Sequence, residues 1–111
     1  MRTYEVDELP AKAIERVVRK LNDSGLAASL EGLFWLPLPR ELLTAEQLEH
    51  FDLCGPYCLS LDCGHDQLRL ELLVRAMNKL HCSCIAYATA EQRAYIIDFL
   101  DTLLRELDIP V

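Results

Sequence analysis

Residues 57–76 read YCLSLDCGHDQLRLELLVRA, and this stretch decides the fold. Apolar and polar residues alternate on both sides of Gly64-His65, with the two-residue period of half-buried strands. A two-residue turn at this point pairs Leu61 with Leu68 and brings the leucines of both strands onto one face. The stretch therefore predicts an antiparallel hairpin with one face in a hydrophobic core.

A third strand is expected over residues 80–88, after a second tight turn at Asn78-Lys79. A two-residue loop there pairs Leu73 with Cys84. The face turned away from the core then carries a small apolar strip, formed by Leu73, Cys82, Cys84 and Ala86, with Cys58 on the same side. Because the main helices are expected on the other face, this strip is the predicted interaction surface for a protein partner or a second copy of the chain.

Amphipathic helices are expected on both sides of these strands. Residues 11–22 carry apolar side chains at helical spacing on one face. The tetrapeptide TAEQ occurs at residues 44–47 and again at 89–92, and each copy is a capping box that begins a helix. The first helix is short and ends near Phe51, whereas the second is long and ends near Leu107.

One further strand is expected at Leu30–Leu36, an apolar run that ends before Pro37. The expected order is therefore α-β-short α-β-β-β-α. It predicts an α+β two-layer sandwich, with an antiparallel sheet of about four strands and the N-terminal and C-terminal helices packed on one face. The 111 residues suit a single domain, 1–111.

Composition narrows the classes of partner. The chain is 51% hydrophobic and has a formal net charge of −7, which disfavours binding to nucleic acid. The first residues are polar, so no signal peptide is expected, and no apolar run approaches the length of a membrane span. We therefore expect a cytoplasmic protein with reduced cysteines that binds neither nucleic acid nor membrane.

All five cysteines lie between residues 54 and 84, namely Cys54, Cys58, Cys63, Cys82 and Cys84. One alternative is a zinc site formed by Cys54, Cys58, Cys82 and Cys84. The predicted strands oppose it, because a strand separates Cys58 from Cys82 and Cys84. Two strand spacings are roughly 9.5 Å, whereas thiolates on one zinc must come within about 4 Å of each other. The favoured interpretation is that these cysteines are reduced, small apolar side chains without a metal or other cofactor.

No motif of the sequence identifies a family or a catalytic residue. The leading functional hypothesis is a non-catalytic protein–protein interaction or adaptor module that forms a homodimer. A zinc-binding protein is the first alternative. The second is a small enzyme with a histidine–carboxylate site, for example His65 with Asp62 or Asp66 in the predicted turn.

Overall fold

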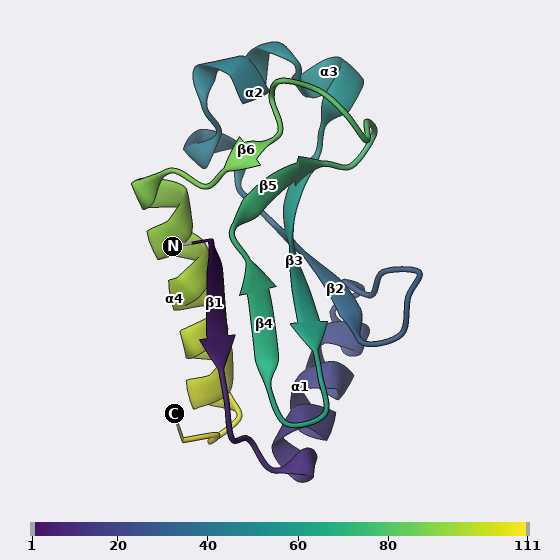
Figure 1. The fold of residues 1–111 in the computed structure, drawn as a ribbon, viewed down its shortest axis with the longest axis vertical. Coiled ribbons are helices and arrows are strands. Elements are labelled where there is room, and N and C mark those ends of the chain that lie inside the picture. The colour runs from purple at the N-terminus through teal and green to yellow at the C-terminus, as the bar shows by residue number, and fades with distance from the viewer. Residues whose placement is uncertain (1, 111) are drawn as a thin grey trace.

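Strand β3 (Tyr57–Cys63) is the centre of one antiparallel sheet in the computed structural model, which describes residues 2–110. β4 (Leu68–Glu71) and β5 (Leu73–Ala76) pair with one edge of β3. β2 (Leu33–Pro37) pairs with its other edge. The predicted α+β class with an antiparallel sheet is confirmed, and the apolar run before Pro37 has its place beside β3 (Figure 1).

The sheet has two further strands at its margins. β1 (Thr3–Val6) pairs with β4 and was not expected from the sequence, although its residues alternate in exposure. β6 (Ala86–Tyr87) pairs with β5. Of the strand predicted over residues 80–88, only these two residues are in a strand. With β4 and β5 counted together as the second strand of the predicted hairpin, the observed order is β-α-β-α-β-β-β-α, which differs from the prediction by the N-terminal strand.

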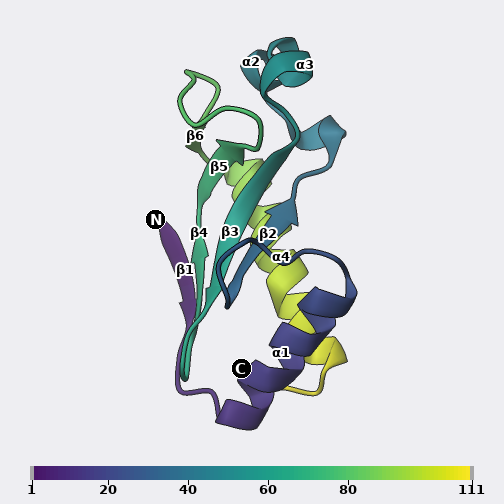
Figure 2. The same ribbon diagram turned by 90° about the vertical axis from the view of Figure 1, so that its right-hand side faces the viewer.

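The helices begin and end close to the predicted residues. They are α1 (Ala11–Asp23), a 3₁₀ turn (Arg40–Leu42), α2 (Ala45–Glu49), α3 (Phe51–Cys54) and α4 (Ala90–Glu106). Figure 2 shows α1 and α4 on the same side of the sheet. The core between the sheet and these two helices is mainly aliphatic. Its fully buried members include Val17, Leu21, Leu59, Leu61, Leu70, Ile96, Leu100 and Leu104. Both layers of the predicted sandwich are therefore present.

The hairpin between β3 and β4 has a different register from the predicted one. Leu61 pairs with Leu70 instead of Leu68, because the connecting loop has four residues, from Gly64 to Gln67. The backbone N–H of Gly64 donates to the carbonyl of Gln67 at 2.8 Å and closes this loop. A shift of two residues preserves the face of every side chain, so the predicted leucine face is still the buried one.

The predicted third strand is wrong over residues 80–85, and Leu73 pairs with Tyr87 instead of Cys84. The turn after β5 is not a two-residue hairpin loop. The backbone N–H of Met77 donates to the Pro56 carbonyl at 2.9 Å, so the chain continues alongside the segment before β3 instead of reversing at Asn78-Lys79. Residues 77–85 consequently form a loop, and the cysteines in it leave the sheet face on which they were expected.

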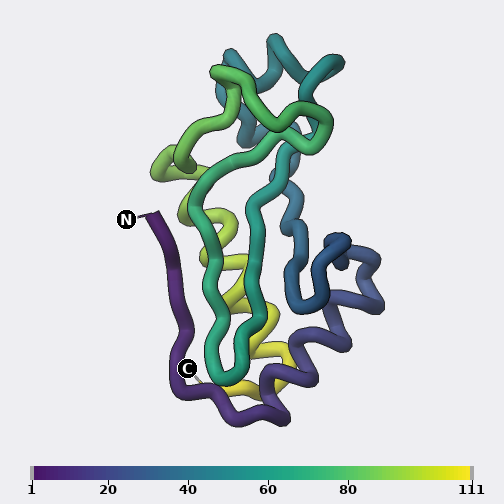
Figure 3. The backbone as a smooth tube through the Cα atoms, turned by 45° about the vertical axis from the view of Figure 1, so that its right-hand side comes forward, coloured from purple at the N-terminus to yellow at the C-terminus, as the bar shows by residue number. Residues whose placement is uncertain are grey.

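This loop packs at one end of the molecule together with α2 and α3. Figures 1 and 3 show the three segments gathered beyond the ends of β3 and β5, away from α1. The molecule is elongated, with extents of 41 × 27 × 20 Å. We call α2, α3 and residues 77–85 the end lobe. Within residues 2–110, no helix has the length and apolarity needed to cross a membrane.

Candidate metal centre

The end lobe brings together one histidine and three cysteines, His50, Cys54, Cys82 and Cys84. Their potential ligand atoms all lie within 4.8 Å of one another. Cys54 and Cys84 are buried, at 3% and 1% exposure, while His50 and Cys82 are half-buried. Two segments that are 28 residues apart in the sequence, at Cys54 and Cys82, thus meet at a single point.

Helical spacing places His50 and Cys54 side by side. His50 is the residue between α2 and α3, and Cys54 is the last residue of α3. The backbone N–H of Cys54 donates to the His50 carbonyl at 2.8 Å, so one helical turn connects the two residues. Residues four apart on a helix share a face, and both side chains therefore point toward the loop.

Hydrogen bonds hold the loop against these short helices. The backbone N–H of Asn78 donates to the Cys54 carbonyl at 3.0 Å, and the Asn78 amide donates to the Gly55 carbonyl. The Ser83 hydroxyl donates to the Glu46 carboxylate. The backbone N–H of Ile85 donates to the carbonyl of Cys82 at 3.1 Å, which makes a tight turn around the two cysteines.

The glutamines of the two TAEQ copies form a buried network that reaches the cluster. Gln92 and Gln47 are 0% and 1% exposed. The Gln92 amide donates to the Gln47 side-chain oxygen at 3.0 Å, and the Gln47 amide donates to the Cys84 carbonyl at 3.2 Å. Both glutamines also complete their capping boxes at Thr44 and Thr89. The start of α4 is thereby connected through Gln47 to the cysteine loop.

The separations within the cluster approach those of a tetrahedral zinc site. A Zn–S bond near 2.3 Å and a Zn–N bond near 2.0–2.1 Å place ligand atoms about 3.5–3.8 Å apart. The Sγ atoms of Cys54 and Cys82 are 3.7 Å apart, and the His50 Nδ1 atom lies 3.2 Å from the Cys82 Sγ. The widest pair needs to move by no more than about 1 Å to surround an ion.

The pKa values of two thiols in the cluster, Cys82 and Cys54, are shifted in opposite directions. A backbone hydrogen bond from Cys84, assisted by the thiol of Cys84 and by His50, lowers the pKa of Cys82 to about 6. Burial, followed by hydrogen bonds to Cys82 and Cys84, raises the pKa of Cys54 to about 11. Cys82 therefore loses its proton more readily than Cys54. A cation among the sulfurs favours the thiolate form of all of them.

Three of the four residues in the zinc alternative, Cys54, Cys82 and Cys84, do come together. Cys58 does not join them. It lies in β3 opposite Arg75, on the other face of the strand from Tyr57, where burial raises its pKa to about 11. The argument against a zinc site was based on the distance of Cys58 from Cys82 and Cys84, and Cys58 is not a member of the cluster.

Sequence reasoning missed His50. Its signal is the spacing H-x3-C, which becomes a same-face pair when the helix continues as far as Cys54. The expected short helix ended near Phe51, so this pair was not recognised. Gln47 was recognised as a capping residue, but its bond to the Cys84 carbonyl depends on the tertiary structure.

The predicted interaction strip lies partly in the cluster, which holds Cys82 and Cys84, and partly outside it. In the strip proposed as an interaction surface, Cys58 and Cys84 are buried, Leu73 and Cys82 are half-buried, and Ala86 is exposed. His65 is exposed in the loop after β3, and so is its neighbour Asp66. Burial, with a smaller effect of Asp62, raises the pKa of Cys63 to about 12.

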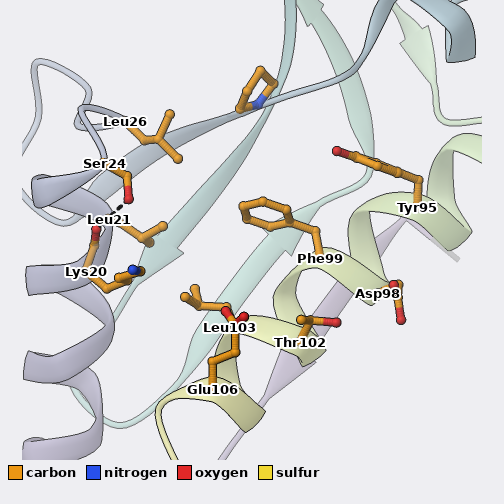
Figure 4. Close-up of a pocket in the computed structure, with 11 residues that line it drawn as sticks. Lys20, Leu21, Ser24, Leu26, Tyr95, Asp98, Phe99, Thr102, Leu103 and Glu106 are labelled. Atoms are coloured by element: carbon orange, nitrogen blue, oxygen red, sulfur yellow. Dashed lines mark hydrogen bonds between the residues drawn. The ribbon is translucent and has the colours of Figure 1, made fainter.

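A separate hollow of about 550 Å³ opens between α1 and α4 (Figure 4). Its wall is largely apolar and includes Leu21, Leu26, Phe99 and Leu103, with Tyr95 at one side. The four residues of the cluster are not part of its lining. The hollow and the cluster are therefore distinct features of the molecule.

The fold and the cluster together describe a small α+β protein with a His–Cys₃ group at one end of its sheet. Comparisons with protein-family models, with curated proteins and with solved structures found no match.

Proposed function

We propose that this protein binds a single zinc ion through His50, Cys54, Cys82 and Cys84, and that the ion has a structural role. One observation carries the proposal: four potential ligand atoms from two distant segments lie within 4.8 Å of one another. Three thiolates and one imidazole form one of the ligand sets of structural zinc sites. The soft sulfur donors favour zinc over magnesium or calcium, which prefer oxygen ligands.

The composition of the end lobe supports a structural role. α2 and α3 have five and four residues, far fewer than the roughly 12–15 that an isolated helix needs for marginal stability. The loop that faces them is anchored in the core mainly by Cys84 and in part by Ile85, whereas Leu80 is 88% exposed. A zinc ion bonded to both segments supplies the stabilisation that this lobe lacks in its packing.

Metal analysis and cobalt substitution test the proposal. Protein purified without chelators is expected to contain about one zinc per chain. Co²⁺ added to the metal-free protein is expected to give the intense visible absorption of a tetrahedral site, together with thiolate-to-cobalt charge transfer. A zinc content near zero, with no tetrahedral spectrum from cobalt, contradicts the proposal.

Serine variants identify the ligands. Cys82→Ser and Cys84→Ser are expected to weaken zinc binding strongly, because each replaces a thiolate by a poor ligand. Cys58→Ser and Cys63→Ser are matched controls that remove a thiol elsewhere in the chain, and both are expected to retain a full complement of metal. A Cys58→Ser variant that loses the metal contradicts the proposed ligand set.

A second candidate function is the protein–protein interaction or homodimer predicted from the sequence, in a cytoplasmic protein. Two exposed leucines of the end lobe favour it, Leu53 on α3 at 75% exposure and Leu80 in the loop at 88%. Exposed apolar side chains near a half-buried cluster suit contact with another protein. Sedimentation of the zinc-loaded protein tests the homodimer, and a strict monomer over a wide concentration range contradicts it.

A further inference from the structure

The hydroxyl group of Tyr57 is a buried polar group with an unmet hydrogen bond. Tyr57 is 1% exposed, and its oxygen has no hydrogen-bond partner within the part of the chain that the structure describes. A buried hydroxyl without a partner is unfavourable, and tyrosine hydroxyls in protein interiors usually find one. A hydrogen-bond acceptor brought close to this hydroxyl would therefore stabilise the protein.

Tyr57 is close to the cluster both in the sequence and in the core. It follows Cys54 by three residues, and its ring packs against that of Phe51, the neighbour of His50, with 6.2 Å between ring centroids. Burial raises the pKa of the phenol, and the thiol of Cys84 adds the next largest effect, followed by those of Cys54 and Cys82. Tyr57 also belongs to the same buried core as Cys54 and Cys84, so its side chain and these two thiols lie in one packed region.

We infer that Tyr57 is a positioning residue that donates a hydrogen bond from its hydroxyl to the Cys84 thiolate once metal binds. The inference rests on the proposed zinc site. A thiol is a weak hydrogen-bond acceptor, whereas a metal-bound thiolate is a charged and much stronger one. A metal-bound Cys84 sulfur would therefore give the buried hydroxyl the partner that it lacks.

This hydrogen bond has two consequences for the site. It fixes the orientation of the Cys84 side chain, while Gln47 bonds to the Cys84 backbone. It also withdraws electron density from the sulfur, which stabilises the thiolate. Outer-shell partners of this kind typically change metal affinity by 10–100-fold when they are removed.

Tyr57→Phe tests the inference in the full-length chain with Co²⁺ as the probe. The variant is expected to bind cobalt about tenfold or more weakly than the wild type. Its thiolate-to-cobalt charge-transfer band is expected to move to longer wavelength, because the sulfur has become more electron-rich. The metal-free variant is expected to be as stable as the metal-free wild type, since the hydroxyl makes no hydrogen bond to lose.

Two control variants separate this role from packing. Phe51→Leu alters the ring contact but keeps the hydroxyl, and it is expected to leave the charge-transfer band in place. Tyr95→Phe removes a hydroxyl from the distant hollow and is expected to change neither measurement. The wild type itself gives a readout without mutation: its tyrosine absorption is expected to shift to longer wavelength on zinc binding.

The outcomes distinguish this inference from the zinc proposal. Cobalt binding by the wild type, with an unmoved charge-transfer band in Tyr57→Phe, overturns the role of Tyr57 and leaves the zinc site intact. A weaker affinity without a band shift indicates a packing role and also overturns the inference. Failure of the wild type to bind cobalt or zinc overturns the zinc proposal and the inference with it.

Discussion

At the scale of single residues, Gly55 shows how closely the end of α3 is packed. A Cβ atom placed on Gly55 would lie 2.9 Å from the Phe51 carbonyl oxygen and 3.0 Å from a ring carbon of Phe51. These contacts are too short, so Gly55→Ala must shift the backbone at residue 55, directly after Cys54, or the Phe51 atoms that it meets. We expect a loss of about 1–3 kcal/mol in the free energy of unfolding, together with weaker zinc binding.

Gly64→Ala is the matched control for this prediction. A Cβ on Gly64 would meet its nearest neighbours at 3.4 Å, which is an ordinary van der Waals distance. Urea unfolding and zinc titration of both variants provide the comparison. Equal behaviour of the two alanine variants would falsify the view that contact with Phe51 requires glycine at residue 55.

A hydrogen bond between Tyr4 and Asp101 gives the chain a defined response to alkaline pH. The Tyr4 hydroxyl donates to an Asp101 carboxylate oxygen at 2.8 Å and connects β1 to α4. Burial first, and then this hydrogen bond and the Asp101 charge, raise the pKa of Tyr4 above its usual value of 10.0. The folded state therefore retains the proton at a pH where the unfolded state has released it, so the stabilisation falls as pH rises above 10.

Tyr4→Phe tests this pH dependence. At pH 8 the variant is expected to be less stable than the wild type by about 1 kcal/mol, because the hydrogen bond is fully present in the wild type. The difference is expected to shrink above pH 10. Urea unfolding at pH 8 and at several values above 10 measures it, and a difference that is constant with pH contradicts the expectation.

At the scale of elements, the two TAEQ copies provide an internally matched pair. The Thr44 hydroxyl accepts from the Gln47 backbone N–H at 3.2 Å at the start of α2, and the Thr89 hydroxyl accepts from the Gln92 N–H at 3.1 Å at the start of α4. Thr44→Ala and Thr89→Ala are each expected to cost about 1 kcal/mol of stability.

Only Thr44→Ala is expected to weaken zinc binding, because α2 leads directly into His50 and carries Gln47. If the lost capping energy falls on the metal site, the affinity decreases about fivefold. Thermal unfolding of the metal-free variants and zinc titration measure the two effects. An equal loss of zinc affinity in both variants would indicate that the end lobe and α4 respond as one unit.

The same elements show which parts of the structure are predictable from sequence. The capping boxes and the amphipathic helices are local features, so Thr44 and Thr89 begin helices as predicted. The path of residues 80–85 is not local. It depends on the bonds from Met77 and Asn78 to the chain around Pro56, and no two-residue periodicity within the segment reports them. The His–Cys₃ cluster was therefore not recognised, because residues 80–85 were expected to form a strand and the short helix was expected to end before Cys54.

At the scale of the whole molecule, the sheet was predictable because the alternation of apolar and polar residues determines which face of the sheet each side chain is on. It determines less firmly which residue of the neighbouring strand each residue pairs with. The β3–β4 register moved by two residues, and the leucine face was unaffected. Beyond β5, the pairing with β6 moved by an odd number, since Leu73 faces Tyr87 instead of Cys84. There the predicted faces were lost, and the strip expected on the outer face became partly buried.

The molecule consists of a sheet with two helices, which supply most of the aliphatic core, and an end lobe that joins this core through Cys54 and Cys84 and is otherwise held by hydrogen bonds. Removal of metal is therefore expected to loosen the end lobe alone. Hydrogen exchange with and without zinc, after chelation, measures this. Amides in residues 44–56 and 77–85 are expected to exchange faster without zinc, while those of β3 and α4 remain protected. Equal loss of protection throughout the chain contradicts a local role, because it makes the aliphatic core dependent on the metal.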